Sequence, residues 1–106
     1  MTIRYLPDAF RDLNEALAYY GQHSPDAAQR FVNAVRAEEQ TILDFPNIAY
    51  AIGEKLRVLR VARFPYSLVY RAIEGDILII AVAPSGNAQN RIARNEEGRV
   101  AARNRG

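Results

Sequence analysis

The stretch KLRVLRVARFPYSLVYRAIEGDILIIAVA, residues 55–83, decides the fold because it holds three strand-like segments in succession. From Lys55 to Phe64, apolar and basic residues alternate. Tyr66 to Ile73 is rich in aromatic and β-branched residues, and Ile77 to Ala83 is almost wholly apolar. Such runs are typical of β-strands. Glu74-Gly75-Asp76 supplies a tight turn between the last two. A strand without a polar face, like the last one, suits the middle of a sheet.

Toward the N-terminus, the sequence predicts one more strand and a first helix. Thr2 to Leu6 alternates apolar and polar residues before Pro7, which is typical of a short strand. Asp8 and Asp12 follow, where carboxylates favour the start of a helix, and Gly21 is expected to end that helix. The apolar stripe of this helix, at helical spacing, consists of Phe10, Leu13, Leu17 and Tyr20.

A second helix is predicted to begin at Ser24-Pro25, where a hydroxyl cap precedes a proline in the first helical position. It keeps an apolar stripe as far as Phe45-Pro46, and Glu38-Glu39 is expected on its solvated face. The short connection predicts an antiparallel helical hairpin, and the link from Asn47 to Glu54 is expected to be irregular. The fold class is therefore α+β: a two-layer sandwich of order β-α-α-β-β-β, with the hairpin packed on a small, mainly antiparallel sheet.

The 106 residues and their composition fit one globular domain. We assign residues 1–83 to that domain and residues 84–106 to a basic tail that is either helical over 90–103 or disordered. The chain has no cysteine, which excludes disulfides and a thiol nucleophile. No apolar stretch is long enough for a bilayer, so we expect a soluble cytoplasmic protein without a membrane partner. With His23 as the one histidine, we expect neither a metal nor a cofactor.

Charge is distributed unevenly along the chain. Residues 1–54 carry four Arg against eight Asp or Glu, whereas residues 55–73 carry five Lys or Arg and no acid. Residues 84–106 carry five Arg against two Glu. A basic half of this kind fits either nucleic acid or an acidic protein partner, and charge alone does not choose between them.

Several motifs in this order resemble the toxins of the RelE/ParE superfamily. The most specific is the aromatic-Pro-Tyr-x-x-Val-Tyr segment from Phe64 to Tyr70, after a basic strand, which is similar to the ParE-like branch. The resemblance covers residues 1–83. Its other elements are Pro7-Asp8-Ala9-Phe10-Arg11-Asp12-Leu13, the pair Tyr19-Tyr20, Phe31, Phe45-Pro46 and the basic run that starts at Arg57.

The resemblance implies a toxin of a type II, plasmid-stabilisation-like toxin–antitoxin system, in complex with a cognate antitoxin whose C-terminal segment wraps it. ParE-like toxins poison DNA gyrase, whereas RelE-like toxins cleave messenger RNA on the ribosome with a cluster of basic residues. Where the RNase branch typically has Arg, this chain carries Ser67. After the last strand, where that branch has a basic stretch or a His and a terminal Tyr, this chain carries Pro84-Ser85-Gly86-Asn87. We therefore expect a gyrase inhibitor that is not itself an enzyme. The alternatives are a ribosome-dependent endoribonuclease and an inactive member that acts as a binding module.

The residues expected to contact the target or its phosphates are basic or aromatic and surround the predicted central strands. Two other roles remain open for the basic ones, since cations also keep an exposed strand edge unpaired and also suit an acidic antitoxin segment. Tyr66 and Tyr70 share one strand face, and packing beneath the helical hairpin is favoured for them over a catalytic role. No catalytic residue is assigned. The candidates are Lys55, Arg57, Arg60, Arg63, Tyr70 and Arg71, with Arg91, Arg94, Arg99 and Arg103 as contacts from the tail.

Overall fold

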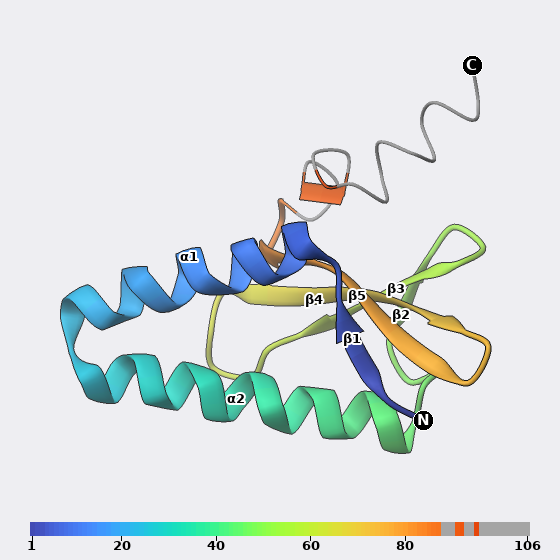
Figure 1. Cartoon of the computed structure of the whole chain (residues 1–106), viewed down its shortest axis with the longest axis horizontal. Helices are drawn as coiled ribbons and strands as arrows, with labels where there is room; N and C mark the ends of the chain where they lie inside the picture. Colours follow the sequence, from blue (N-terminus) through green and yellow to red (C-terminus); the bar gives the residue numbers. More distant parts are fainter. Residues whose placement is uncertain (88–90, 93–94, 96–106) are drawn as a thin grey trace.

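Two antiparallel helices cover one face of a five-stranded sheet (Figure 1). The structure is a computed structural model that describes residues 1–87, 91, 92 and 95. The sheet has the order β1-β5-β4-β3-β2, in which β1 pairs with β5 in parallel and every other pair is antiparallel. The predicted α+β sandwich is thereby confirmed. Its elements are β1 (Ile3–Tyr5), α1 (Pro7–His23), α2 (Pro25–Asp44), β2 (Tyr50–Ile52), β3 (Leu56–Arg60), β4 (Tyr66–Ile73) and β5 (Asp76–Pro84).

The strands predicted from residues 55–83 are all present, and β5 lies between β1 and β4 as its apolar sequence indicates. The turn between β4 and β5 has two successive residues in the left-handed region, Glu74 at φ 43° and Gly75 at φ 86°. This is the arrangement of a two-residue hairpin turn. The additional strand β2 was predicted as irregular link; it has three residues, too few for a period of two to be visible.

The helix boundaries agree with the sequence at Ser24 and differ at Gly21. The Ser24 hydroxyl accepts a hydrogen bond from the Ala27 amide at 3.0 Å, and Pro25 opens α2 as predicted. Helix α1 continues past Gly21 to His23, so the predicted end was wrong. The chain leaves the helix at Ser24, whose extended backbone ends α1 and caps α2 at the same time.

Gly21→Ala is expected to raise the free energy of unfolding by about 0.5–1 kcal/mol, because Gly21 lies within a helix and alanine restricts the unfolded chain. A Cβ atom added at Gly21 meets nothing within 4 Å. Gly75→Ala is the matched control: it also meets no atom, but its φ of +86° strains any L side chain. Urea denaturation should show opposite signs for the two variants. A loss of stability at Gly21 contradicts this assignment.

The core between the layers is mainly aliphatic and contains one group of aromatic rings. Rings of Tyr20, Phe31, Phe64 and Tyr66 lie with centroids 5.1–6.2 Å apart, mostly edge to face. The buried face of α1 is centred on Ala9 and Ala16, with Leu13, Leu17 and Tyr20 packed beside them. Phe10, predicted in the core, is instead 55% exposed. One position along the helix rotates a side chain by about 100°, which moves Phe10 off the buried stripe.

Glu38 and Glu39 lie at the contact between α2 and the sheet rather than on a solvated face, so that prediction was wrong. Glu38 Oε2 accepts the Ala62 amide at 2.9 Å, in the turn between β3 and β4. Glu39 Oε2 accepts the Tyr5 hydroxyl of β1, and burial, with this bond, raises the pKa of Tyr5. Both carboxylates thus attach α2 to sheet elements that the sequence pattern could not place.

The opposite face of the sheet has an apolar cluster of its own. The register shifts between Val69 and Tyr70, where Ile80 of β5 is left without a partner residue in β4. Such a bulge interrupts the alternation of side chains. Val69, Ile80 and Ala81 are consequently buried together on the face away from the helices, and Ile92 packs against this cluster.

Candidate functional site

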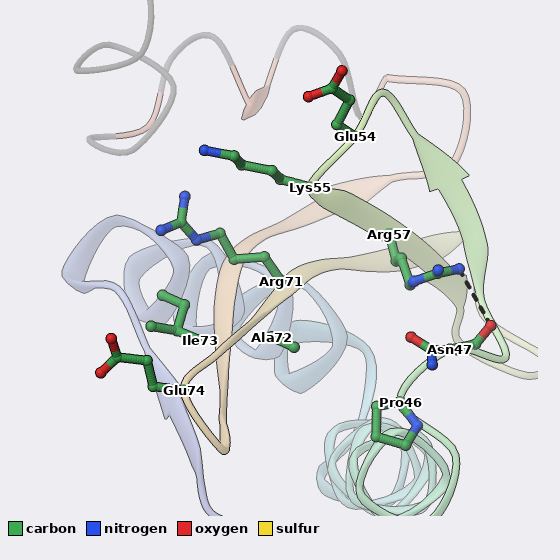
Figure 2. Close-up of a pocket in the computed structure, with 9 residues that line it drawn as sticks. All are labelled: Pro46, Asn47, Glu54, Lys55, Arg57, Arg71, Ala72, Ile73 and Glu74. Carbon is green, nitrogen blue, oxygen red and sulfur yellow. Dashed lines mark hydrogen bonds between the residues drawn. The ribbon is translucent and has the colours of Figure 1, made fainter.

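A cleft of about 450 Å³ lies where the chain leaves α2 and passes the ends of β3 and β4 (Figure 2). It brings together three of the predicted basic residues, Lys55, Arg57 and Arg71. Two carboxylates, Glu54 and Glu74, share the cleft, so its charge is mixed. The remaining lining residues are Pro46, Asn47, Ala72 and Ile73.

Arg57 is bound to the backbone of the segment between α2 and β2. Its Nη1 donates to the carbonyl of Ala49 at 2.9 Å and to the carbonyl of Asn47 at 3.2 Å (Figure 2). A guanidinium that donates to two backbone carbonyls contributes to the fold. In this geometry Arg57 is first of all a structural residue, and substitutions at Arg57 alone do not isolate a functional contact.

Tyr70 lies beneath the same segment and has no exposed surface. Its hydroxyl donates to the carbonyl of Pro46 at 2.8 Å. Burial raises the pKa of Tyr70, and the neighbouring Arg57 offsets part of that rise. The buried ring is placed as a packing residue under the hairpin rather than as a contact for phosphates. Tyr70 and Arg57 together hold the turn that follows α2.

Arg60 and Arg63 are exposed and do not line the cleft. Arg60 ends β3 opposite Ser67, and Arg63 lies in the turn that follows, with a left-handed φ of 70°. Ser67 stands where the RNase branch carries a basic residue; it is 6% exposed, with its hydroxyl oxygen 3.5 Å from that of Ser85. The cations predicted as one group are therefore divided between the cleft and the β3–β4 turn.

The tail arginines that were predicted to contact the target are only partly described by the structure. Arg94, Arg99 and Arg103 lie outside the described residues. The Arg91 side chain is largely buried, with its Nη1 2.5 Å from Asp12 Oδ1 and 3.8 Å from Glu15 Oε2. Residues 84–106 were expected to form a tail that is either helical over 90–103 or disordered; of the residues described there, Arg91, Ile92 and Asn95 contact the domain. A short polar segment is held here by buried hydrogen bonds, which a count of apolar residues does not detect.

Asp12 is the functional candidate that sequence reasoning missed. It was predicted to favour the helix start, but its side chain is 1% exposed. Its Oδ2 accepts the Val82 amide of β5 at 3.1 Å and the Asn95 side-chain amide at 3.0 Å. Asn95 also donates to the Ile80 carbonyl at 2.9 Å. We call Asp12, Arg91 and Asn95 the C-terminal clamp. The signal was its spacing, since Asp12 falls at helical period between Ala9 and Ala16 on the buried face.

The clamp occupies the part of β5 that β1 leaves uncovered. Strand β1 is paired as far as Tyr5 and Ile79, and Leu6 bonds the Ile79 carbonyl at 3.0 Å. Beyond that point the edge groups of Ile80 and Val82 need other partners, because buried backbone groups are costly when unpaired. The Asp12 carboxylate accepts the Val82 amide, and the Asn95 side-chain amide donates to the Ile80 carbonyl.

A second surface is apolar. Phe45, Ile48 and Tyr50 are 61%, 58% and 79% exposed at the end of α2 and on the edge strand β2. An open apolar cleft of about 440 Å³ lies along residues 44–48 and shares Pro46 and Asn47 with the mixed-charge cleft. Phe10 and Tyr19 are exposed on α1. Exposed large apolar groups gathered in this way mark interaction surfaces.

Two further findings concern the part of the chain that the structure describes. No group of three or more His, Cys, Asp or Glu side chains is arranged to hold a metal ion among those residues. None of the helices described is long and apolar enough to cross a membrane.

Comparison with known proteins gives one family and one fold. Residues 3–88 match the family described as the ParE toxin of the type II toxin–antitoxin system parDE. Among solved structures, the fold is similar to a chain of the chromosomal ParDE TA system from P. aeruginosa. That match has a TM-score of 0.69 and 19% identity, and covers 80% of this chain and 96% of that one. No significant match to a curated protein is found.

Proposed function

The chain belongs to the ParE toxin family, and from this membership we propose that it acts by binding DNA gyrase and is neutralised by a cognate antitoxin in the cytoplasm. The observation that carries the proposal is the family match over residues 3–88, which includes every element of the sheet and the hairpin. A type II toxin of this kind works through a target and a partner protein, so its sites are binding surfaces.

The geometry supports binding rather than catalysis. General acid–base cleavage of RNA needs a proton donor, a proton acceptor and a cation that all reach one phosphate. In the described residues, Tyr70 is buried under the turn after α2, and Arg57 is bound to two backbone carbonyls. Ser67 stands where the resemblance to the RNase branch leads us to expect a basic residue. Lys55 and Arg71 also line the cleft.

Gyrase inhibition is tested with the purified full-length chain, relaxed plasmid and gyrase. We expect supercoiling to stop at a stoichiometric excess of the protein, and Lys55→Ala and Arg71→Ala to weaken inhibition several-fold. Arg36→Ala, on the exposed surface of α2, is the matched control because it removes the same charge away from the cleft. Full supercoiling at excess wild-type protein, with its helical circular dichroism intact, rejects the gyrase proposal.

The cations of the cleft keep one alternative in view, a ribosome-dependent endoribonuclease acting on messenger RNA. It predicts cleaved message in a translating extract, lost on Lys55→Ala with the fold preserved. An intact message at high protein dose rejects it. If neither gyrase nor message is affected, the chain is an inactive member that serves as a binding module.

For the antitoxin, we propose a surface that runs from the hairpin to the edge strand β2. The exposed side chains of Phe10 and Tyr19 lie on α1, and those of Phe45, Ile48 and Tyr50 border β2. A partner segment can add a strand at such an edge while burying apolar groups beside it. Hydrogen exchange on the complex should show new protection over residues 8–45 and in β2. Protection confined to residues beyond Pro84 contradicts this surface.

A further inference from the structure

The sheet face turned away from the helices carries cations around its apolar cluster. Side chains alternate along a strand, so Arg60 shares this face with Val58, and Arg71 shares it with Val69. Arg60 is paired with Ser67, four residues before Arg71, which separates the two arginines by about 13 Å along the strands. The two guanidinium groups thus flank the buried cluster.

Lys55 joins the same side of the molecule. Figure 2 shows the side chains of Lys55 and Arg71 extending in one direction, whereas Arg57 turns toward Asn47. We call Lys55, Arg60 and Arg71 the cationic face. These three residues belong to the stretch 55–73, which has five cations and no acid, whereas the residues before it have an acidic balance. Glu54 and Glu74 stand directly before and after this stretch and share the cleft with Lys55 and Arg71.

The C-terminal clamp fixes a chain segment on this face. Ile92 packs on the apolar cluster, and Asn95 bonds both Asp12 and the Ile80 carbonyl. In Figure 1 the segment at residues 91–92 lies beside the start of α1, where Arg91 contacts Asp12.

We propose that the cationic face binds the phosphate backbone of nucleic acid, and that Asp12 is the positioning residue that holds the C-terminal segment beside it. The apolar residues at the centre of this face, Val69, Ile80 and Ala81, are fully buried, and Leu56, Val58 and Leu78 beside them are partly buried. Lys55 and Arg60 are exposed at its border. Contact there is dominated by charge, as in the sequence-independent part of nucleic-acid binding. The inference does not depend on gyrase being the target, because binding is measured on the toxin alone.

The test is fluorescence anisotropy of the full-length chain with a labelled short DNA duplex, and in a second arm with single-stranded RNA of equal length. We expect affinity to fall steeply between about 50 and 200 mM salt. Arg60→Ala and Arg71→Ala should each lower the slope of log K against log salt by about 1. Arg30→Ala and Arg36→Ala on α2 remove the same charge and should leave the slope unchanged. An equal effect at α2, or no binding of either nucleic acid, overturns the proposal.

The positioning role is tested by Asn95→Ala, which breaks the clamp without changing any charge. The variant should show faster hydrogen exchange at the Val82 amide and several-fold weaker DNA binding. Lys55, Arg60 and Arg71 are unchanged in this variant, so their contribution to the slope of log K against log salt should be preserved. If Asn95→Ala destabilises the fold, Asn95→Ser serves as a second variant, because it also leaves the net charge unchanged and removes the side-chain amide that bonds Asp12 and Ile80. Binding of either folded variant that equals the wild type, with Val82 exchange accelerated, overturns the role of the clamp.

Discussion

Asp12→Ala is expected to lower the free energy of unfolding by about 3 kcal/mol, because it removes one partner of a buried ion pair. Three groups lose an acceptor: the Arg91 guanidinium, the Val82 amide and one bond of the Asn95 amide. The Arg91 side chain is 14% exposed and can turn partly to water, which keeps the effect at the lower end of the usual range for such losses. Urea denaturation followed by circular dichroism measures the change as a shift of the midpoint.

Glu15→Ala is the matched control for Asp12. Glu15 stands one turn further along α1 and faces the same arginine at 3.8 Å, but its side chain is 55% exposed. Exposed pairs contribute about 0–1 kcal/mol, since water and salt screen them. Equal changes in the free energy of unfolding for Asp12→Ala and Glu15→Ala contradict the buried ion pair between Asp12 and Arg91.

Phe31→Ala is expected to lower the free energy of unfolding by about 3–5 kcal/mol. Phe31 has no exposed surface, and its ring centroid lies 5.1 Å from those of Tyr20 and Phe64 and 5.4 Å from that of Tyr66. Its removal leaves a cavity at the meeting point of both helices and the β3–β4 turn. Since small domains have about 5–15 kcal/mol of stability in total, the variant is expected at the margin of folding.

Phe10→Ala makes the same chemical change at an exposed position of α1. We expect a change within about 0.5 kcal/mol, because few contacts are lost and alanine favours a helix. Thermal unfolding of the two variants tests whether Phe10 is exposed, as in the structure, or part of the core, as the sequence predicted. A larger loss at Phe10 than at Phe31 contradicts the packing described.

The local features that the sequence predicted correctly are those set by neighbouring residues. Ser24 and Pro25 define the start of α2 through one hydroxyl and one ring, and Glu74-Gly75 define a turn through their left-handed backbone. The interior position of β5, between β1 and β4, was predicted from its lack of a polar face. Each of these inferences needs no knowledge of distant parts of the chain.

The features that were missed depend on contacts between distant residues. Asp12 is buried because Arg91 and Asn95, some 80 positions later, supply its partners. Glu38 is engaged by the Ala62 amide, and Arg57 by carbonyls of the α2–β2 link. A helical period shows which face is buried but not which polar groups meet there. Strand β2 is three residues long and exists through its pairing with β3.

For the candidate site, the sequence identified basic residues but not their grouping. Lys55, Arg57 and Arg71 meet at one cleft, whereas Arg60 lies at the far end of β3. Spacing along the strands does give the shared face of Arg60 and Arg71 once the register is known. The burial of Tyr70 is decided by the turn after α2, which accepts its hydroxyl at Pro46.

The central claim, that the chain is the toxin of a toxin–antitoxin pair, is tested most directly by growth after induction. The full-length chain is expressed alone and together with the reading frame encoded beside it, and colony-forming units are counted over time. The account predicts arrest when the chain is expressed alone and normal growth when both are expressed, with equal amounts of the folded chain in each culture. Normal growth with abundant folded chain expressed alone contradicts the claim.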